Sequence, residues 1–193
     1  MEKQMKNLII GFLVLLVLGL GGWTIYNQST GTNSNTPTSQ SDSTPATNGK
    51  TLDLSNKGIT EISSDIYNKT DIIVLILSNN NLESLKSEMG KMTKLEVLKL
   101  DHNRLKGSLI GEIRKMPLRE LDVSYNNMTG IPAEIGQLSR LETLDYSYNN
   151  IDTYPNEIAN LKQLKTLKLT GNPFSAEKIA ELKSKLPNAS IEF

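Results

Sequence analysis

The sequence predicts an α/β solenoid, in which short parallel strands stack along one face and short helical turns cover the other. The first observation behind this prediction is a nearly identical string, LDVSYNN at 121–127 and LDYSYNN at 144–150, whose two copies lie 23 residues apart. The second is that steps of 23 residues from Leu144 reach a leucine in five further units. Spacing of this length is typical of stacked repeat architectures.

The apolar positions of each unit are those that a half-buried strand needs. The marker leucines are Leu52, Leu75, Leu98, Leu121, Leu144 and Leu167, and apolar residues also stand two and seven places after each of them. Alternation of apolar and polar residues is the period of a strand with one buried face. One such strand cannot bury its apolar face alone, so we expect the units to stack into a parallel ladder with a shared core.

An asparagine column follows the strands, where the backbone turns away. It comprises Asn80, Asn103, Asn126, Asn149 and Asn172, with Lys57 in the first unit. Asparagine carries a donor and an acceptor in one side chain, so aligned asparagines can bond the backbone of neighbouring turns. Leaving such a buried group unpaired costs about 1–3 kcal/mol. We therefore interpret this column as a structural ladder.

Units such as LEVLKLDHNRL at 95–105 and LETLDYSYNNI at 141–151 resemble the leucine-rich repeat family. Six consecutive units cover 50–174. The resemblance implies a horseshoe with a parallel sheet on its concave face and short helical or 3-10 turns on its convex face.

The second half of each unit favours the convex turns. The segments IPAEIGQLSR at 131–140 and YPNEIANLKQ at 154–163 place a proline ahead of apolar residues at helical spacing. In the unit at 105–118 the apolar residues lie one position later than the corresponding residues of the other units. Residues 175–193 read as a C-terminal cap, because Ser175 is a good N-cap and apolar residues follow it at helical spacing.

Residues 8–26 contain no charge and are long enough to cross roughly 30 Å of hydrocarbon as a helix. We predict a single-pass signal-anchor helix, with a cleaved signal peptide or a buried core helix as alternatives. Cleavage sites favour small residues, and the first alanine after the apolar run is Ala46. Lys3 and Lys6 precede the span and the next basic residue is Lys50, which predicts residues 1–7 in the cytoplasm and the repeats outside.

Residues 27–49 hold 11 serines and threonines, one charge and almost no apolar side chain. Such a composition predicts a disordered linker, which as a flexible tether would span roughly 25 Å on average. A glycosylated stalk is the alternative.

Composition narrows the class of protein. Lysine plus arginine equals aspartate plus glutamate at 21 each, so no charge excess indicates a nucleic-acid partner. Cysteine is absent, which excludes disulfides and favours a bacterial envelope protein, because extracellular eukaryotic relatives in this family usually carry disulfide-bonded caps. His102 is the single histidine, and neither a zinc motif nor a phosphate loop is present. We expect no enzyme activity, metal or cofactor.

The concave face offers two columns of candidate partner-binding residues. The residue after each marker gives Asp53, Ile76, Lys99, Asp122, Asp145 and Lys168, and the residue four places after it gives Asn56, Asn79, His102, Tyr125, Tyr148 and Gly171. Exposed aromatic residues are typical of recognition surfaces. The candidates for binding are Tyr125, Tyr148, His102, Lys99, Asp122 and Asp145. The alternatives are a charge row in which Lys99 and Lys168 compensate the two aspartates, and tyrosines that only pack.

These observations favour a membrane-anchored, extracytoplasmic module that binds a protein or a glycan on its concave face. A structural or adhesive envelope component without a discrete ligand is the alternative. A hydrolase is the third alternative. It would need a serine opposite Asp101 and His102 to complete a catalytic triad, and nothing in the spacing requires one.

The orientation can be tested by adding a protease to intact cells. We expect the enzyme to cut within 27–49 and release the repeats, because an extended Ser/Thr-rich segment outside the membrane is accessible. N-terminal sequencing of the mature chain would show whether the segment 8–26 is retained. Repeats that resist the protease in intact cells but not in lysed cells would contradict the orientation.

Overall fold

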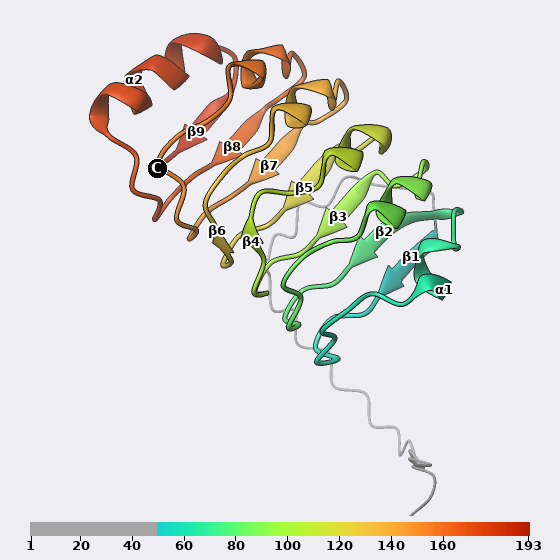
Figure 1. Ribbon diagram of the computed structural model, residues 1–193. Helices are drawn as coiled ribbons and strands as arrows, with labels where there is room; N and C mark the ends of the chain where they lie inside the picture. The colour runs from blue at the N-terminus through green and yellow to red at the C-terminus, as the bar shows by residue number, and fades with distance from the viewer. Residues whose placement is uncertain (1–49) are drawn as a thin grey trace, which may run out of the picture. The chain divides into compact units, whose positions relative to one another are not determined.

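The marker leucines lie in one parallel sheet. In the computed structural model, which describes residues 50–193, seven strands follow one another in the order β1-β2-β3-β5-β7-β8-β9 (Figure 1). Their bounds are β1 (Lys50–Asp53), β2 (Ile72–Ile76), β3 (Val97–Lys99), β5 (Glu120–Asp122), β7 (Thr143–Asp145), β8 (Thr166–Lys168) and β9 (Ser190–Glu192). The chain therefore adds one strand at a time to the same growing edge.

The register of the sheet follows the 23-residue spacing. Each marker leucine is the direct partner of the next, from Leu52 through Leu167, and Leu167 is in turn opposite Ile191. The four inner markers Leu75, Leu98, Leu121 and Leu144 are 0% exposed. Stacking of identical positions thus produces one continuous core from repeated short strands.

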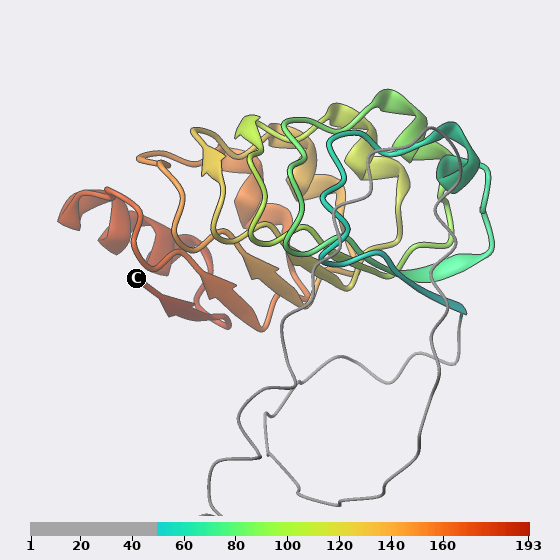
Figure 2. The ribbon, with the colours of Figure 1, turned by 90° about the horizontal axis from the view of Figure 1, so that it is seen from below.

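Short helices cover the other face of the core. They are α1 (Ser64–Tyr67) and the 3-10 helices η1 (Ser87–Lys91), η2 (Gly111–Lys115), η3 (Ala133–Gln137) and η4 (Asn156–Asn160). Figure 2 shows these turns along one side and the strands along the other. Pro132 and Pro155 precede η3 and η4 at φ values of −73° and −74°, so the fixed φ of proline suits each helix start. Ile135 and Ile158 then point into the core and are fully buried.

The asparagines join consecutive turns. Asn126 donates from Nδ2 to the carbonyls of Val123 in its own turn and of Leu100 in the preceding one, at 3.1 and 3.0 Å. Its Oδ1 accepts from the backbone N–H of Leu105 at 2.9 Å. The same three contacts recur for Asn80, Asn103, Asn149 and Asn172. Each side chain therefore satisfies backbone groups of two repeats.

The C-terminal segment forms a helix and a strand. The Oγ atom of Ser175 accepts from the backbone N–H of Lys178 at 3.2 Å and caps α2 (Ala176–Lys185). Leu182 of α2 is fully buried. The chain then returns to pair β9 with β8, which the sequence did not predict. The last repeat is thereby covered by both a helix and a seventh strand.

A second small sheet lies where the repeats are irregular. Strand β4 (Lys106–Gly107) pairs in parallel with β6 (Asn127–Met128). Gly107 has a φ of +66°, a conformation that costs glycine little. This pairing accommodates the unit at 105–118, whose apolar residues Leu109 and Ile113 are both buried despite their late position.

The predicted anchor at 8–26 and linker at 27–49 lie outside the described residues. Within 50–193 none of the helices is both long and apolar enough to span a bilayer.

Replacing Leu98 with alanine should lower the free energy of unfolding by about 2–5 kcal/mol, because it opens a cavity in the shared core. Leu52→Ala is the matched control, since Leu52 occupies the same column but is only half-buried at the end of the sheet. We expect a smaller loss for the control in chemical denaturation. A loss below about 1 kcal/mol for Leu98→Ala would contradict the shared core.

Candidate functional site

The carboxylates on the exposed face of the strands are held by the turns that follow them. The Oδ1 atom of Asp122 accepts from the backbone N–H of Ser124 at 2.9 Å and from its hydroxyl at 2.7 Å. Asp53 makes the same pair of bonds with Ser55, at 2.9 and 2.6 Å. The repeated Asp-x-Ser pattern therefore fixes each carboxylate beside the start of the turn.

The charge row predicted on this face is only partly formed. Lys168 Nζ lies 3.7 Å from Asp145 Oδ2, as the sequence predicted. Lys99, however, lies 3.5 Å from Glu120 Oε1 rather than pairing with Asp122, its direct neighbour across the sheet. The Oδ1 atom of Asp122 already accepts two hydrogen bonds from Ser124. Glu120 lies on the same strand as Asp122, and its longer side chain reaches Lys99. The prediction that Lys99 compensates Asp122 was therefore wrong.

Asp122 carries the electrostatic cost of this arrangement. Its pKa is raised to about 6. Burial is the largest cause, the hydrogen bonds from Ser124 oppose the rise, and the neighbouring carboxylates of Asp145 and Asp101 add to it. In Asp53, which is exposed, the hydrogen bonds from Ser55 lower the pKa instead. The same local turn thus gives opposite pKa directions at the centre and at the end of the sheet.

Three aromatic rings stack along the carboxyl ends of the strands. The ring centroids of His102 and Tyr125 lie 4.3 Å apart, and those of Tyr125 and Tyr148 also lie 4.3 Å apart, with interplanar angles of 16° and 17°. Tyr125 and Tyr148 are 45% and 47% exposed. The predicted aromatic column therefore forms a continuous exposed stack at the border of the sheet.

The backbone places these rings. His102, Tyr125 and Tyr148 have φ values of 53°, 52° and 53°, a left-handed conformation that is uncommon for residues other than glycine. Gly171 ends the row, and a Cβ atom there would lie 2.7 Å from Tyr148 Cδ1. Glycine is therefore needed at this position to leave room for the Tyr148 ring.

Carboxylates border the stack. His102 Nδ1 lies 3.0 Å from Asp101 Oδ2. The hydroxyl of Ser78 donates a hydrogen bond to the other carboxylate oxygen of Asp101. Partial desolvation raises the pKa of Tyr125, and the adjacent Tyr148 and the charge of Asp145 add to this rise. The aromatic stack and the aspartates therefore belong to one surface.

The structure gathers most of the predicted candidates but adds two residues. Tyr125, Tyr148, His102, Asp122 and Asp145 share the surface, and Lys99 turns toward Glu120. Glu120 was missed, and Asp101 was considered only for a catalytic triad, because the predicted binding residues came from only two columns of the repeat. The columns one place before and three places after each marker contain them.

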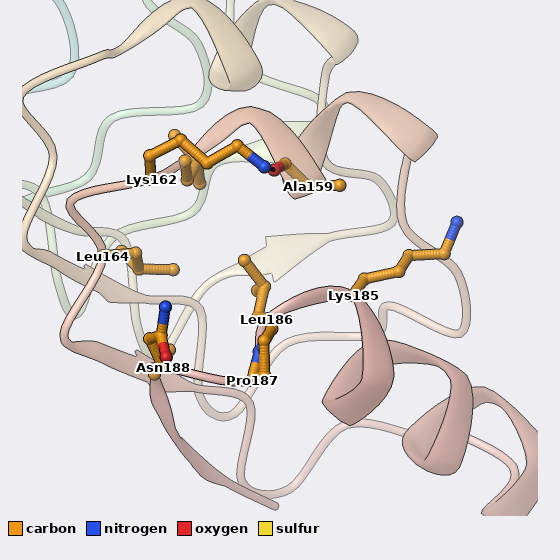
Figure 3. Close-up of a pocket in the computed structure, with 9 residues that line it drawn as sticks. Ala159, Lys162, Leu164, Lys185, Leu186, Pro187 and Asn188 are labelled. Atoms are coloured by element: carbon orange, nitrogen blue, oxygen red, sulfur yellow. Dashed lines mark hydrogen bonds between the residues drawn. The ribbon is translucent and has the colours of Figure 1, made fainter.

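A small hollow lies between η4 and the C-terminal segment (Figure 3). Its volume is about 110 Å³, and Leu161, Leu164 and Leu186 form much of its wall. In Figure 3 the ammonium of Lys185 points away from it, while Lys162 Nζ donates to the carbonyl of Ala159 at 2.7 Å. Its lining contains no carboxylate or histidine, and no group of three or more metal-ligating side chains occurs within 50–193. The hollow therefore supplies no acid–base pair.

Known proteins share the repeat. Family models described as leucine rich repeat match residues 94–116 and 117–174. The chain is a leucine-rich repeat protein. No curated protein sequence matches it significantly.

Solved leucine-rich repeat structures are similar to this leucine-rich repeat protein over part of their length. The ectodomain of the plant membrane receptor kinase GASSHO1/SCHENGEN3 from Arabidopsis thaliana, in complex with CASPARIAN STRIP INTEGRITY FACTOR 2, is 36% identical, covers 72% of this chain and has a TM-score of 0.60. In the structure of PEPR1–AtPEP1, the matching chain is 26% identical in sequence, covers 59% of this chain and has a TM-score of 0.54. A leucine-rich repeat protein of Leptospira interrogans is 24% identical, covers 69% and has a TM-score of 0.43. The chain spans 17% of each of the first two and 52% of the third.

Replacing Asp122 with asparagine should stabilise the protein above pH 6. The folded pKa of about 6 lies above the ordinary value of 3.8, so the folded state binds the proton more tightly and stability falls as pH rises through this window. Asparagine keeps the oxygen that accepts from Ser124 and removes the charge. We expect a gain of about 1–3 kcal/mol at pH 7.5 and little change at pH 4, measured by denaturant unfolding.

Asp53→Asn is the control for this substitution, because Asp53 makes the same bonds to Ser55 but its pKa is lowered. It should bring no gain at pH 7.5. An equal gain from both variants would show that burial of Asp122 is not the cause.

Proposed function

We propose that this leucine-rich repeat protein binds another protein through its concave sheet, with Tyr125 and Tyr148 at the centre of the contact. The observation that carries the proposal is the exposed aromatic stack. Tyr125 and Tyr148 are the large hydrophobic side chains left exposed within 50–193. Aromatic residues bury a large area on binding at a small entropic cost, and hot spots cluster near the centre of an interface.

The solved relatives support a protein partner. The GASSHO1/SCHENGEN3 ectodomain, 36% identical to this chain over the region they share, was crystallised in complex with CASPARIAN STRIP INTEGRITY FACTOR 2. We propose that the present chain also binds a protein ligand. A glycan is the second class of ligand for the same face.

The charge of the face favours a partner with basic side chains. Asp122 has no cationic partner within 50–193, and its pKa is raised by burial and by the adjacent carboxylates. A lysine or arginine of a bound protein would offset this repulsion, since an opposite charge close by favours the ionised carboxylate. His102, Lys99 and Asp145 would form the polar surround.

The setting we propose is the outside of a cell membrane, in a bacterial envelope. The support is the uncharged segment 8–26, the basic residues before it and the absence of cysteine. We propose a binding role without catalysis.

A structural role without a discrete ligand is favoured by one observation. The Tyr125 ring is covered on both faces, by His102 and by Tyr148, so its stacking is already satisfied within the protein. Under this alternative the stack would stabilise the repeats and contact no partner.

The double change Tyr125→Ala with Tyr148→Ala should weaken partner binding by at least about 2 kcal/mol, or roughly thirtyfold in Kd. The partner would first be captured from envelope extract with the full-length chain and identified, and its affinity then measured by calorimetry. The control is Asn56→Ala with Asn79→Ala. These residues occupy the same column at φ values of 58° and 57°, so alanine meets the same backbone strain without the loss of a ring.

Unchanged affinity in a folded double tyrosine variant would place the contact elsewhere. Failure to capture any partner would favour the structural alternative.

A further inference from the structure

The amino ends of the strands carry a large excess of positive charge. We define the strand-entry edge as the last two residues of each short helix with the loop that leads into the next strand: 66–71, 90–96, 114–119, 136–142, 159–165 and 184–189. Its cations are Lys69, Lys91, Lys94, Arg114, Lys115, Arg119, Arg140, Lys162, Lys165 and Lys185, against the carboxylates Asp71, Glu96 and Glu142. Ten against three leaves an excess of seven in a chain that is neutral as a whole.

The opposite edge of the sheet shows no such excess. The loops that follow the strands, at 56–63, 79–86, 102–110, 125–132, 148–155 and 171–175, hold four lysines and arginines against three carboxylates. Because the strands are parallel, all their amino ends lie on one side, as the arrow tails in Figure 1 show. Adjacent strands are about 4.8 Å apart, so the cations form a row roughly 25 Å long.

The carboxylates of the edge neutralise only part of this row. Glu142 is shared by Arg119, at 2.6 Å, and Lys165. Glu96 lies 3.7 Å from Arg140. Outside the edge, Glu134 lies 3.9 Å from Arg114 and Glu181 lies 3.3 Å from Lys185. The edge lysines without an ion pair in the described part of the chain are all exposed: Lys69, Lys91, Lys94, Lys115 and Lys162.

Two adjoining hollows lie along the same row. One, of about 250 Å³, is lined by Arg114, Lys115 and Arg140 among others. The second, of about 280 Å³, is lined by Arg119, Arg140, Glu142 and Gln163. Arg140 lines both, so three arginines from two consecutive segments of the edge, 114–119 and 136–142, border the two hollows. Guanidinium groups bind sulfate, phosphate and carboxylate groups with paired hydrogen bonds.

We propose that the strand-entry edge binds a linear anionic polysaccharide. The row of cations matches a polymer whose negative groups repeat along its length, and the hollows accept groups that project from such a chain. The large hydrophobic side chains exposed within 50–193, Tyr125 and Tyr148, lie at the other ends of the strands. The edge therefore lacks large exposed apolar residues to enter a bilayer and aromatic rings to stack on nucleic-acid bases. This surface is separate from the concave face and does not depend on its function.

The test uses the full-length chain in a mild detergent and measures its affinity for heparin, polygalacturonate and neutral dextran at physiological salt. We expect binding to one or both anionic polymers, weakening as salt rises, and none to dextran. The triple change Lys91→Gln, Lys94→Gln and Lys115→Gln should weaken binding about tenfold or more, since each cation near an anionic surface contributes substantially. The matched control, Lys57→Gln, Lys86→Gln and Lys106→Gln, removes the same charge from the opposite edge and should have a much smaller effect.

A second measurement needs no variant. Acetylation of the wild-type protein with and without heparin or polygalacturonate, read by mass spectrometry, should show protection of Lys91, Lys94 and Lys115. Lys57, Lys86 and Lys106 should react equally in both samples. The change of Tyr125 and Tyr148 to alanine should leave polysaccharide binding intact, which separates this proposal from the concave one.

Three results would overturn the proposal. The first is an equal loss in both triple variants, which would mean attraction to charge in general. The second is a lack of binding to either anionic polymer. The third is tighter binding to phosphatidylglycerol vesicles or to single-stranded DNA than to the polysaccharides.

Discussion

The fold depends on the need to satisfy the backbone where each strand turns away from the sheet. One asparagine per repeat meets this need, because its amide donates to carbonyls of two turns and accepts from an N–H of the preceding turn. These bonds hold neighbouring turns at a fixed spacing, and the residue before each of Asn80, Asn103, Asn126 and Asn149 lies at positive φ. The aromatic stack is a direct result, since Tyr125 and Tyr148 occupy that preceding position. The exposed surface of this leucine-rich repeat protein is thus set by its buried amides.

Local periodicity made the sheet predictable, but side-chain choices on its surface were not. The spacing of Leu98 and Leu121 fixed their register, because a strand with one buried face cannot slip by one residue without exposing its core. The spacing did not fix whether Lys99 would turn to Asp122 or to Glu120, since both lie within reach. Strand β9 escaped prediction because Ile191 comes 24 residues after Leu167 and has no asparagine after it. The stacking of His102 with the tyrosines could be expected from the column alone.

Net charge is a poor guide to this protein. Its 21 basic and 21 acidic side chains balance, and this balance predicts no nucleic-acid partner. The balance conceals a separation that follows from the repeat: lysines and arginines recur before the strands, whereas several aspartates recur on their exposed face. Parallel stacking turns each recurring position into a row. Surfaces of opposite sign therefore lie side by side on a chain whose net charge is zero.

The near-identity of 121–127 and 144–150 means that this fold is extensible. Each repeat presents to the next the same edge that it receives from the one before, so a whole unit could be gained or lost in the gene without disturbing the bonds of the others. Every added unit would lengthen the sheet by about 4.8 Å. The reach of the binding surface is therefore a property that evolution can change in discrete steps, independently of the side chains that give it specificity.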